Sequence, residues 1–459
     1  MSGAPRVMLA GTGSGCGKTT VTCAVLKALV RRGLKVQAFK CGPDYIDPMF
    51  HTRVTGRASR NLDSFLLPGD TLRGLLSKNT KGADCSVIEG VMGFYDGLHA
   101  TVTASSYEVA VMTQTPVILI VNARGASVSL AATIKGFMDF HGDSGIIGVI
   151  LNEVGEGACS YLKPVLEEET GIEVLGYMPR VEDYSLSSRH LGLVTAQEVR
   201  DIDAIVDRLA VQAERSLCLD RILELASRAP CLAAKLSQLD GLDFVPLAPF
   251  RLAVAQDEAF CFYYRDAFDL LEETGAELVF FSPLYDEALP NGIQGLYLGG
   301  GYPELHAAQL SANTSMMDDI RNRIGKGLPT FAECGGFMAL CEFLRTEEGT
   351  FRMSGAIEGE AYMTQHLVRF GYVEMTARRS SVMADAGHTI RAHEFHYSDS
   401  TNNGDGFDIT KPRSSAATWS GIHASKTLHA GYPHVHLCGD PLMAVKFAKA
   451  CVGFSEQFC

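Results

Sequence analysis

Short apolar runs alternate with helix-like stretches along the first half of this chain. The apolar runs are rich in β-branched residues and nearly continuous, as central parallel strands tend to be. They cover residues 6–11, 35–40, 85–90, 116–122 and 146–152, with helical patterns between them such as 19–33 and 129–140. Because a strand, a helix and a second strand make a parallel crossover unit, we predict an open, mostly parallel sheet with helices on both faces.

The alternation restarts after residue 250, following a further predicted strand near 171–181. Strand-like runs return at 251–257, 277–283, 295–301 and 329–336. A chain of 459 residues is longer than one hydrophobic core usually serves. We therefore predict two α/β domains joined by a helical segment and linker. The N-terminal domain covers 1–195, the helical segment and linker 196–250, and the C-terminal domain 251–459.

The composition argues against several classes of function. A formal net charge of −13 disfavours nucleic acid or an anionic membrane as the main partner. No apolar run approaches the roughly 20 residues of a spanning helix, and the N-terminus does not have the pattern of a signal peptide. The 13 cysteines show neither a CxxC pair nor zinc-site spacing, which is typical of reduced thiols, so we expect a cytoplasmic protein.

A glycine-rich loop, GTGSGCGKTT, joins the first predicted strand to the first predicted helix. Its glycines let backbone N–H groups point inward, while the helix N-terminus and Lys18 add positive charge. The usual phosphate loop has four residues between its first glycine and its Gly-Lys pair, whereas five separate Gly11 from Gly17 here. We assign the whole loop to ATP binding: Gly11, Thr12, Gly13, Ser14, Gly15, Cys16, Gly17, Lys18, Thr19 and Thr20.

Carboxylates follow two of the predicted strands. Asp44 and Asp47 lie in a turn-rich stretch after one strand, and Glu89 ends another. Ligands of open α/β sheets bind beyond the carboxyl ends of the strands, and Mg²⁺ prefers oxygen ligands. We therefore expect Thr19, Asp47 and Glu89 to hold Mg²⁺. Asp44 either belongs to the substrate site or caps its own loop through backbone N–H groups.

In the second predicted domain, LPTFAECGGFMAL places Cys334 at a sharp strand-to-helix turn with two glycines behind it. This is the geometry of a nucleophile elbow, and we expect the helix N-terminus to lower the thiol pKa. Backbone N–H groups near Gly300 and Gly301, in GLYLGGGYPE, are candidates to stabilise an oxyanion. The required base is a histidine, and the late candidates are His393, His396, His423, His429, His434 and His436.

These motifs resemble a known family. The five-residue loop spacing is similar to that of the dethiobiotin synthetase group, whose members use ATP to activate a carboxylate. With GPDYIDPMFH, EGVMGFYDG and RHLGLV, the chain resembles the cobyrinate a,c-diamide synthase family over nearly its whole length. The resemblance implies an α/β protein with an N-terminal P-loop synthetase domain and a C-terminal class I glutamine amidotransferase-like domain.

The resemblance also implies residue roles. AGYPHVHL is similar to the Tyr-x-His end of triad amidotransferases, which makes His434 the base and puts His436 where classical members carry a Glu. Arg189 and His190 are implied as substrate contacts, with Arg180 as a further candidate cation. The group that orients His434 stays open.

The implied reaction uses ATP, Mg²⁺ and L-glutamine. One domain would phosphorylate a carboxylate, and the other would release ammonia from glutamine through a Cys334 thioester. The family's substrate is a tetrapyrrole polycarboxylate, cobyrinate, amidated at its a and c acetates in cobalamin biosynthesis. Ni-sirohydrochlorin and hydrogenobyrinate are alternative rings. A P-loop partitioning ATPase and a glutamine hydrolase with a nucleotide-sensing domain are alternatives of another class, and a homodimer stays open as the oligomeric state.

Overall fold

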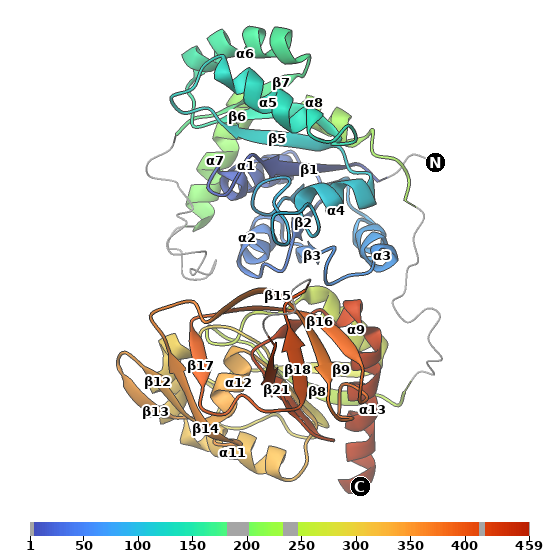
Figure 1. Cartoon of the computed structure of the whole chain (residues 1–459), viewed down its shortest axis with the longest axis vertical. Coiled ribbons are helices and arrows are strands. Elements are labelled where there is room, and N and C mark those ends of the chain that lie inside the picture. Colours follow the sequence, from blue (N-terminus) through green and yellow to red (C-terminus); the bar gives the residue numbers. More distant parts are fainter. Residues whose placement is uncertain (1–3, 181–201, 233–246, 413–417, 459) are drawn as a thin grey trace. The chain divides into compact units, whose positions relative to one another are not determined.

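A computed structural model describes residues 4–180, 202–232, 247–412 and 418–458. The chain divides into two compact units, Met1–Ser237 and Gln238–Cys459, and each is described by itself (Figure 1).

Seven parallel strands form the sheet of the first unit, in the order β3-β2-β4-β1-β5-β6-β7. The strands are β1 (Arg6–Gly11), β2 (Val36–Cys41), β3 (Arg60–Leu62), β4 (Cys85–Glu89), β5 (Val117–Asn122), β6 (Ile146–Asn152) and β7 (Val174–Met178). The predicted parallel sheet is confirmed, and β1, which precedes the glycine-rich loop, lies in its middle.

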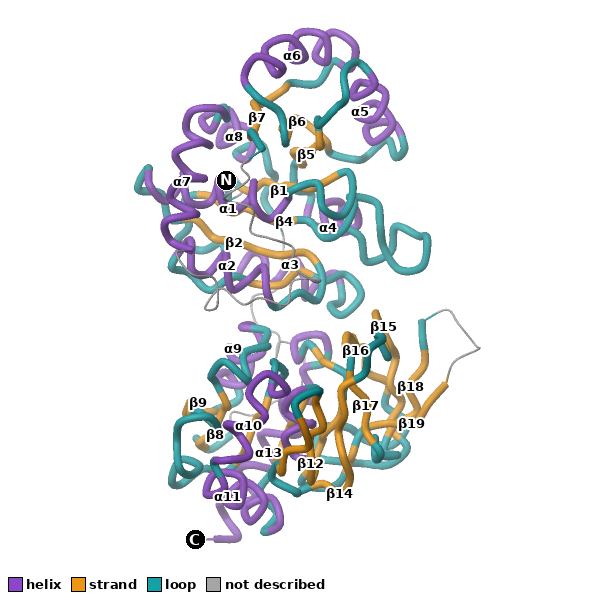
Figure 2. The backbone as a smooth tube through the Cα atoms, turned by 90° about the vertical axis from the view of Figure 1, so that its left-hand side faces the viewer, coloured by secondary structure: helices purple, strands orange, loops and turns teal. Residues whose placement is uncertain are grey.

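Helices cover both faces of this sheet, as predicted. They are α1 (Lys18–Arg31), α2 (Ile46–Thr55), α3 (Gly69–Asn79), α4 (Ser106–Thr113), α5 (Ser129–Asp139), α6 (Glu156–Thr170), α7 (Ile202–Ser216) and α8 (Leu219–Ala226). Figure 2 shows α1, α7 and α8 on one face and α4 and α5 on the other. Val21, Val25 and Leu29 recur every four residues along α1 and share a core with α7 and α8, so both later helices belong to the first unit.

The second unit is built on a six-stranded sheet in the order β20-β21-β11-β10-β8-β9. Its strands are β8 (Phe250–Ala255), β9 (Ala276–Phe281), β10 (Gly295–Leu298), β11 (Thr330–Glu333), β20 (His423–Ala424) and β21 (Leu428–Gly431). The four runs predicted after residue 250 are β8 to β11, which pair in parallel. The helices of this unit are α9 (Arg265–Glu273), α10 (Ala307–Ala312), α11 (Thr314–Gly325), α12 (Gly335–Leu340) and α13 (Pro441–Phe458).

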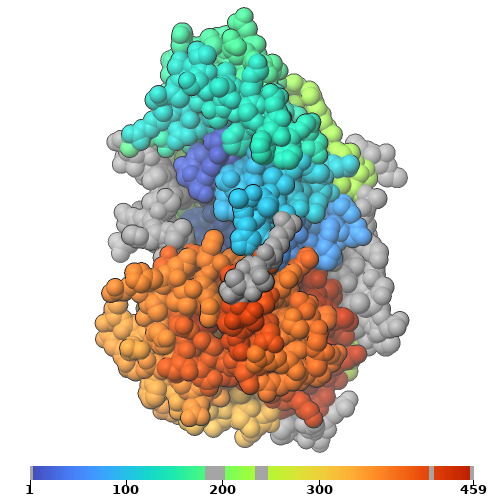
Figure 3. Space-filling model, in the orientation of Figure 1, coloured from blue at the N-terminus to red at the C-terminus, as the bar shows by residue number. Residues whose placement is uncertain are grey.

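Two further sheets follow Cys334 in sequence, and the motif analysis did not predict them. One contains β12 (Cys341–Thr346), β13 (Gly349–Arg352), β14 (Ile357–Met363) and β17 (Ser398–Ser400). The other contains β15 (Arg369–Ala377), β16 (Thr389–His396), β18 (Phe407–Thr410), β19 (Thr418–Gly421) and β22 (His434–Val435). In the space-filling view, the orange segments that follow Cys334 form much of the visible surface of this unit (Figure 3).

Among the helices of the described ranges, none combines the length and apolarity that crossing a bilayer requires.

Candidate active site

The glycine-rich loop bends between the central strand of the first sheet and its first helix. Strand β1 ends at Gly11, and α1 begins at Lys18, as predicted. The Lys18 side chain turns back over the loop, where Nζ donates to the Gly13 carbonyl at 2.9 Å. Burial lowers the pKa of Lys18 from its ordinary value. The ammonium group is thus held beside the N–H groups of the loop, an arrangement suited to a phosphate.

Gly17 has a structural reason to be glycine. Its φ is 92°, and a Cβ atom at this position would lie 2.1 Å from Nδ2 of Asn152. The same Nδ2 donates to the Cys16 carbonyl at 2.9 Å. Asn152, at the end of β6, therefore fixes the loop from two strands away in the sheet, a role that no sequence motif predicts.

The three residues predicted to bind Mg²⁺ come together beyond the ends of β2 and β4. Oγ1 of Thr19 donates to Oε1 of Glu89 at 2.8 Å and lies 3.3 Å from Oδ2 of Asp47. A residue that the sequence analysis missed, Lys40, completes the cluster. Its Nζ lies 2.5 Å from Oδ2 of Asp47 and 2.9 Å from Oε1 of Glu89, and the side chain is buried.

Charge and burial shift the pKa values of Asp47 and Glu89 in opposite directions. Burial raises the pKa of Asp47, and the neighbouring Asp44 raises it further. Burial also opposes ionisation of Glu89, but Lys40 and His51 outweigh it and hold the pKa of Glu89 below its usual range. Lys40 and His51 therefore favour the charged form of Glu89 and hold its carboxylate from two sides.

This donor set fits a magnesium ion. A hydroxyl and two carboxylates are the hard oxygen ligands that Mg²⁺ takes, and Mg²⁺ usually fills its remaining positions with water and substrate phosphates. Within the described ranges no three His, Cys, Asp or Glu side chains form a metal-binding group. A cation at Thr19, Asp47 and Glu89 would therefore depend on the nucleotide to complete its coordination.

The predicted substrate contacts have different outcomes. Oδ1 of Asp44 accepts from the N–H groups of Ile46 at 2.8 Å and Asp47 at 3.1 Å, so the carboxylate caps the start of α2, one of its two alternatives. A substrate role for Asp44 stays a prediction. Arg189 and His190 lie outside the described residues, and Arg180 is exposed after β7.

Cys334 lies at the bend between β11 and α12 with a backbone that side chains rarely adopt, φ 48° and ψ −105°. Two glycines, Gly335 and Gly336, let the bend pack closely against neighbouring backbone. A Cβ atom on Gly336 would lie 2.1 Å from the Leu298 carbonyl oxygen, and one on Gly335 would lie 3.1 Å from the backbone nitrogen of Gly301. The elbow is therefore packed directly against the end of β10, where the predicted oxyanion glycines lie.

The same glycines contact the predicted base. A Cβ atom on Gly300 would lie 2.5 Å from Cε1 of His434, so the imidazole rests on the glycine backbone. The glycine turn after β10 thus contacts both the Cys334 elbow and His434. A nucleophile, a base and backbone donors in this arrangement are the parts of an acyl-transfer site.

The prediction that the helix N-terminus lowers the pKa of the Cys334 thiol is wrong. Burial raises the pKa of Cys334 above its usual range, and the charge of Glu304 raises it further. The six-residue helix α12 does not offset the loss of solvation. Burial likewise lowers the pKa of His434 to about 3. Burial therefore favours the neutral thiol and the neutral imidazole over an ion pair of thiolate and imidazolium.

The other histidines lie around this site in distinct ways. His436 stacks on Tyr264 with 4.5 Å between ring centroids, and neither of its ring nitrogens has a hydrogen-bond partner in the described part of the chain. It does not orient His434 as the Glu of a triad would. His393 pairs with His434 in the register of β16 and β22, and the ring of His396 stacks on Tyr432.

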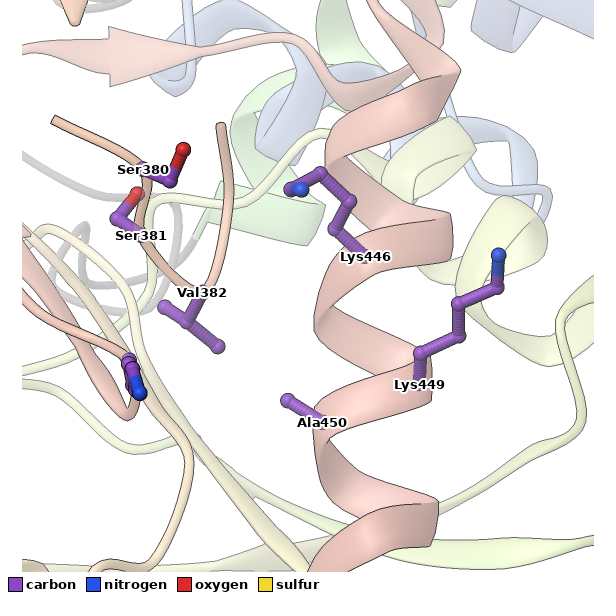
Figure 4. A pocket seen from close by; sticks show the side chains of 7 residues that line it. Ser380, Ser381, Val382, Lys446, Lys449 and Ala450 are labelled. Carbon is purple, nitrogen blue, oxygen red and sulfur yellow. The ribbon is translucent and has the colours of Figure 1, made fainter. Parts of the chain in front are cut away.

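A separate pocket lies between the segment Ser380–Val382 and helix α13 (Figure 4). Lys426, Lys446 and Lys449 contribute to its lining. None of the residues assigned to nucleotide or thiol chemistry lines it.

The fold and these two sites define a nucleotide-binding domain joined to a glutamine amidotransferase domain. Residues 7–194 match the profile of the CobQ/CobB/MinD/ParA nucleotide binding domain, and residues 251–441 match that of the CobB/CobQ-like glutamine amidotransferase domain. The chain belongs to the cobyrinate a,c-diamide synthase family, as its motifs predicted.

Three curated relatives illustrate the match, and each is named cobyrinate a,c-diamide synthase. The Priestia megaterium protein is 39% identical, over 98% of this chain and 98% of its own length. The Caldanaerobacter subterraneus protein is 38% identical, over 98% of this chain and 99% of its own length. The Salmonella typhimurium protein is 42% identical, over 95% of this chain and 96% of its own length.

Proposed function

We propose that this chain is an ATP- and glutamine-dependent amide ligase that converts the a and c acetate carboxylates of cobyrinate to amides in cobalamin biosynthesis. The observation that carries the proposal is the presence in one chain of two complementary sites. One gathers a phosphate loop with Thr19, Asp47 and Glu89, and the other gathers Cys334 and His434 around a glycine turn. The names of the full-length relatives support the choice of substrate.

The first site is suited to activating a carboxylate. An amine does not displace the oxygen of a carboxylate at neutral pH, and transfer of the ATP γ-phosphoryl group to that oxygen makes a good leaving group. Lys18 and the loop N–H groups would stabilise the charge of the transferring phosphoryl group. Bound Mg²⁺ would neutralise phosphate charge. Lys40, paired with Asp47 and Glu89, offsets part of their negative charge at this site.

The second site is suited to releasing ammonia. As the Cys334 sulfur attacks the side-chain amide carbon of glutamine, its proton passes to neutral His434. N–H groups of the turn at Gly300 and Gly301 would stabilise the oxyanion. His434 then protonates the departing nitrogen, which leaves as ammonia, and water releases glutamate from the thioester. Ammonia displaces phosphate from the acyl phosphate and forms the amide.

The test is product analysis with purified full-length protein, ATP, Mg²⁺ and glutamine. Cobyrinate, hydrogenobyrinate and Ni-sirohydrochlorin are offered separately, and mass spectrometry counts the amides formed. We expect two amides on cobyrinate, each with one ATP consumed. Cobyrinate with ¹⁸O-labelled carboxylates should transfer label to the released phosphate. Absence of label would refute the acyl phosphate, and diamidation of another ring alone would reassign the substrate. A switch ATPase would form no amide on any ring.

We also infer a cytoplasmic location, because ATP and reduced thiols are both found there.

A further inference from the structure

The carboxyl group of Glu333, the residue directly before Cys334, lies where three elements of the amidotransferase site meet. The side chain is 2% exposed. Its Oε1 accepts from the backbone N–H of Val435 at 2.8 Å, and its Oε2 accepts from the hydroxyl of Tyr297 at 2.8 Å. Glu333 ends β11, Val435 follows His434 in β22, and Tyr297 lies in β10, the strand that leads to Gly300.

The contact between Glu333 and Val435 crosses between two sheets. Strand β11 belongs to the six-stranded sheet, whereas β22 is an edge strand of the five-stranded sheet. Strand β22 has only two residues, so few backbone contacts within its own sheet define its position. The Cys334 N–H donates to the Gly431 carbonyl at 2.7 Å, which fixes the chain before His434. The Glu333 carboxyl fixes it after His434.

Successive side chains of a strand point to opposite faces, and Glu333 shares its face with Phe331, whose ring stacks on Tyr297 with 4.6 Å between centroids. In the described part of the chain no Lys or Arg pairs with Glu333, and burial raises its pKa to about 8. A negative charge there would raise the pKa of Cys334 further. The charge therefore does not assist the nucleophile, whereas the hydrogen bond from Val435 connects β11 to the strand of the base, and the one from Tyr297 holds the carboxyl group against β10.

We propose that Glu333 is a positioning residue that holds His434 in place against Gly300 by fixing the backbone of Val435. Two functions of the carboxyl group are separable, its charge and its reach. Glutamine keeps the length of the side chain and an oxygen acceptor for Val435 without the charge. Aspartate keeps an ionisable carboxyl group but is one methylene too short to reach both Val435 and Tyr297.

The experiment measures glutaminase kcat and KM in full-length Glu333→Gln and Glu333→Asp. We expect Glu333→Gln to retain most of the wild-type kcat. We expect Glu333→Asp to lose about 100-fold in kcat, the scale of a 1 Å misplacement, with KM for glutamine nearly unchanged. Ammonia-driven amidation should be normal in both variants, which reports that the rest of the chain is folded. The reverse order, active Asp and inactive Gln, would overturn the proposal, as would wild-type kcat in Glu333→Asp.

Tyr297→Phe provides a second test if Glu333→Asp does not fold. It keeps the ring and removes one partner of the carboxyl, so kcat should fall while KM is retained; an unchanged kcat would overturn the proposal. The inference rests on the proposed function, in which Cys334 is the nucleophile. The Cys334→Ser variant distinguishes a failure of the proposed function from a failure of the role of Glu333. Glutaminase activity in Cys334→Ser would refute the proposed function. An inactive Cys334→Ser beside a fully active Glu333→Asp would refute only the role of Glu333.

Discussion

Nε2 of His51 lies 2.7 Å from Oε2 of Glu89, and neither side chain is exposed to solvent. The other ring nitrogen of His51 lies 3.4 Å from Oγ of Ser59. The imidazole therefore fixes the carboxylate oxygen that Thr19 does not contact. A partner of this kind orients a metal-binding carboxylate.

Replacement of His51 by leucine should weaken the response of the enzyme to Mg²⁺. Glu89 keeps Lys40 but loses the contact that sets its rotation, so we expect the Mg²⁺ concentration for half-maximal ATP-dependent amidation to rise about 10- to 100-fold. His51→Gln, which can still donate to Glu89, is the matched control and should lie near wild type. Equal Mg²⁺ titrations for His51→Leu and wild type would contradict the role of His51.

Cys334→Ser should abolish amidation with glutamine, by about 1,000-fold or more, because the nucleophile is lost. Amidation with an added ammonium salt should continue, because activation of the carboxylate takes place at the other site. Cys341→Ser, at a second buried cysteine seven residues later, is the control and should retain both activities. Loss of ammonia-driven amidation in a folded Cys334→Ser protein would contradict the division of labour between the two sites.

Lys18→Ala should lower amidation with either nitrogen source by about 100-fold or more, because charge on the transferring phosphoryl group loses its buried cation. Basal glutaminase activity should be retained. Lys27→Ala removes another α1 lysine, one that pairs with Asp207 at 3.4 Å, and serves as the control. Wild-type amidation in Lys18→Ala, measured by phosphate release and product mass, would exclude the loop as the ATP site.

The pH dependence of glutaminase should reflect the burial of His434. Burial favours the neutral imidazole and lowers its pKa to about 3, so the base stays unprotonated when the pH falls through the ordinary histidine value of 6.5. We expect kcat/KM for glutamine, which reports the free enzyme, to keep its His434-dependent activity through pH 6.5 and to lose it only as the pH approaches about 3. A fall of kcat/KM at low pH with its midpoint at 6.5 or above would contradict the burial of His434.

The sequence was informative where local chemistry determines the structure. Gly17 needs its left-handed backbone, and the strand before the loop needs its apolar run, so the phosphate loop and the parallel sheet were both predictable. Glu89 was recognisable because it ends an apolar strand. The Cys334 bend was recognisable from the glycines that follow it.

The missed residues depend on contacts between distant segments. In the sequence, Lys40 looks like an ordinary charged residue near the end of a strand. Its burial follows from the position of β2 between β3 and β4, which the local sequence does not indicate. In the sequence, Glu333 is simply an acidic residue beside a cysteine. Nothing near it indicates the contact with Val435, because that residue lies in another sheet. The thiol pKa was wrongly predicted because the helix N-terminus is a local feature, whereas the burial that dominates comes from the whole unit. A polar residue inside an apolar strand is the signal that could have identified both Lys40 and Glu333.

The neutral state of Cys334 also bears on the chemical durability of the enzyme. Oxidation of cysteine to sulfenic and higher acids proceeds through the thiolate and requires access to the sulfur. Cys334 is 9% exposed and burial favours its protonated form, so its sulfur offers peroxide little to attack between turnovers. The burial that raises the thiol pKa therefore also protects the sulfur from oxidation until glutamine arrives.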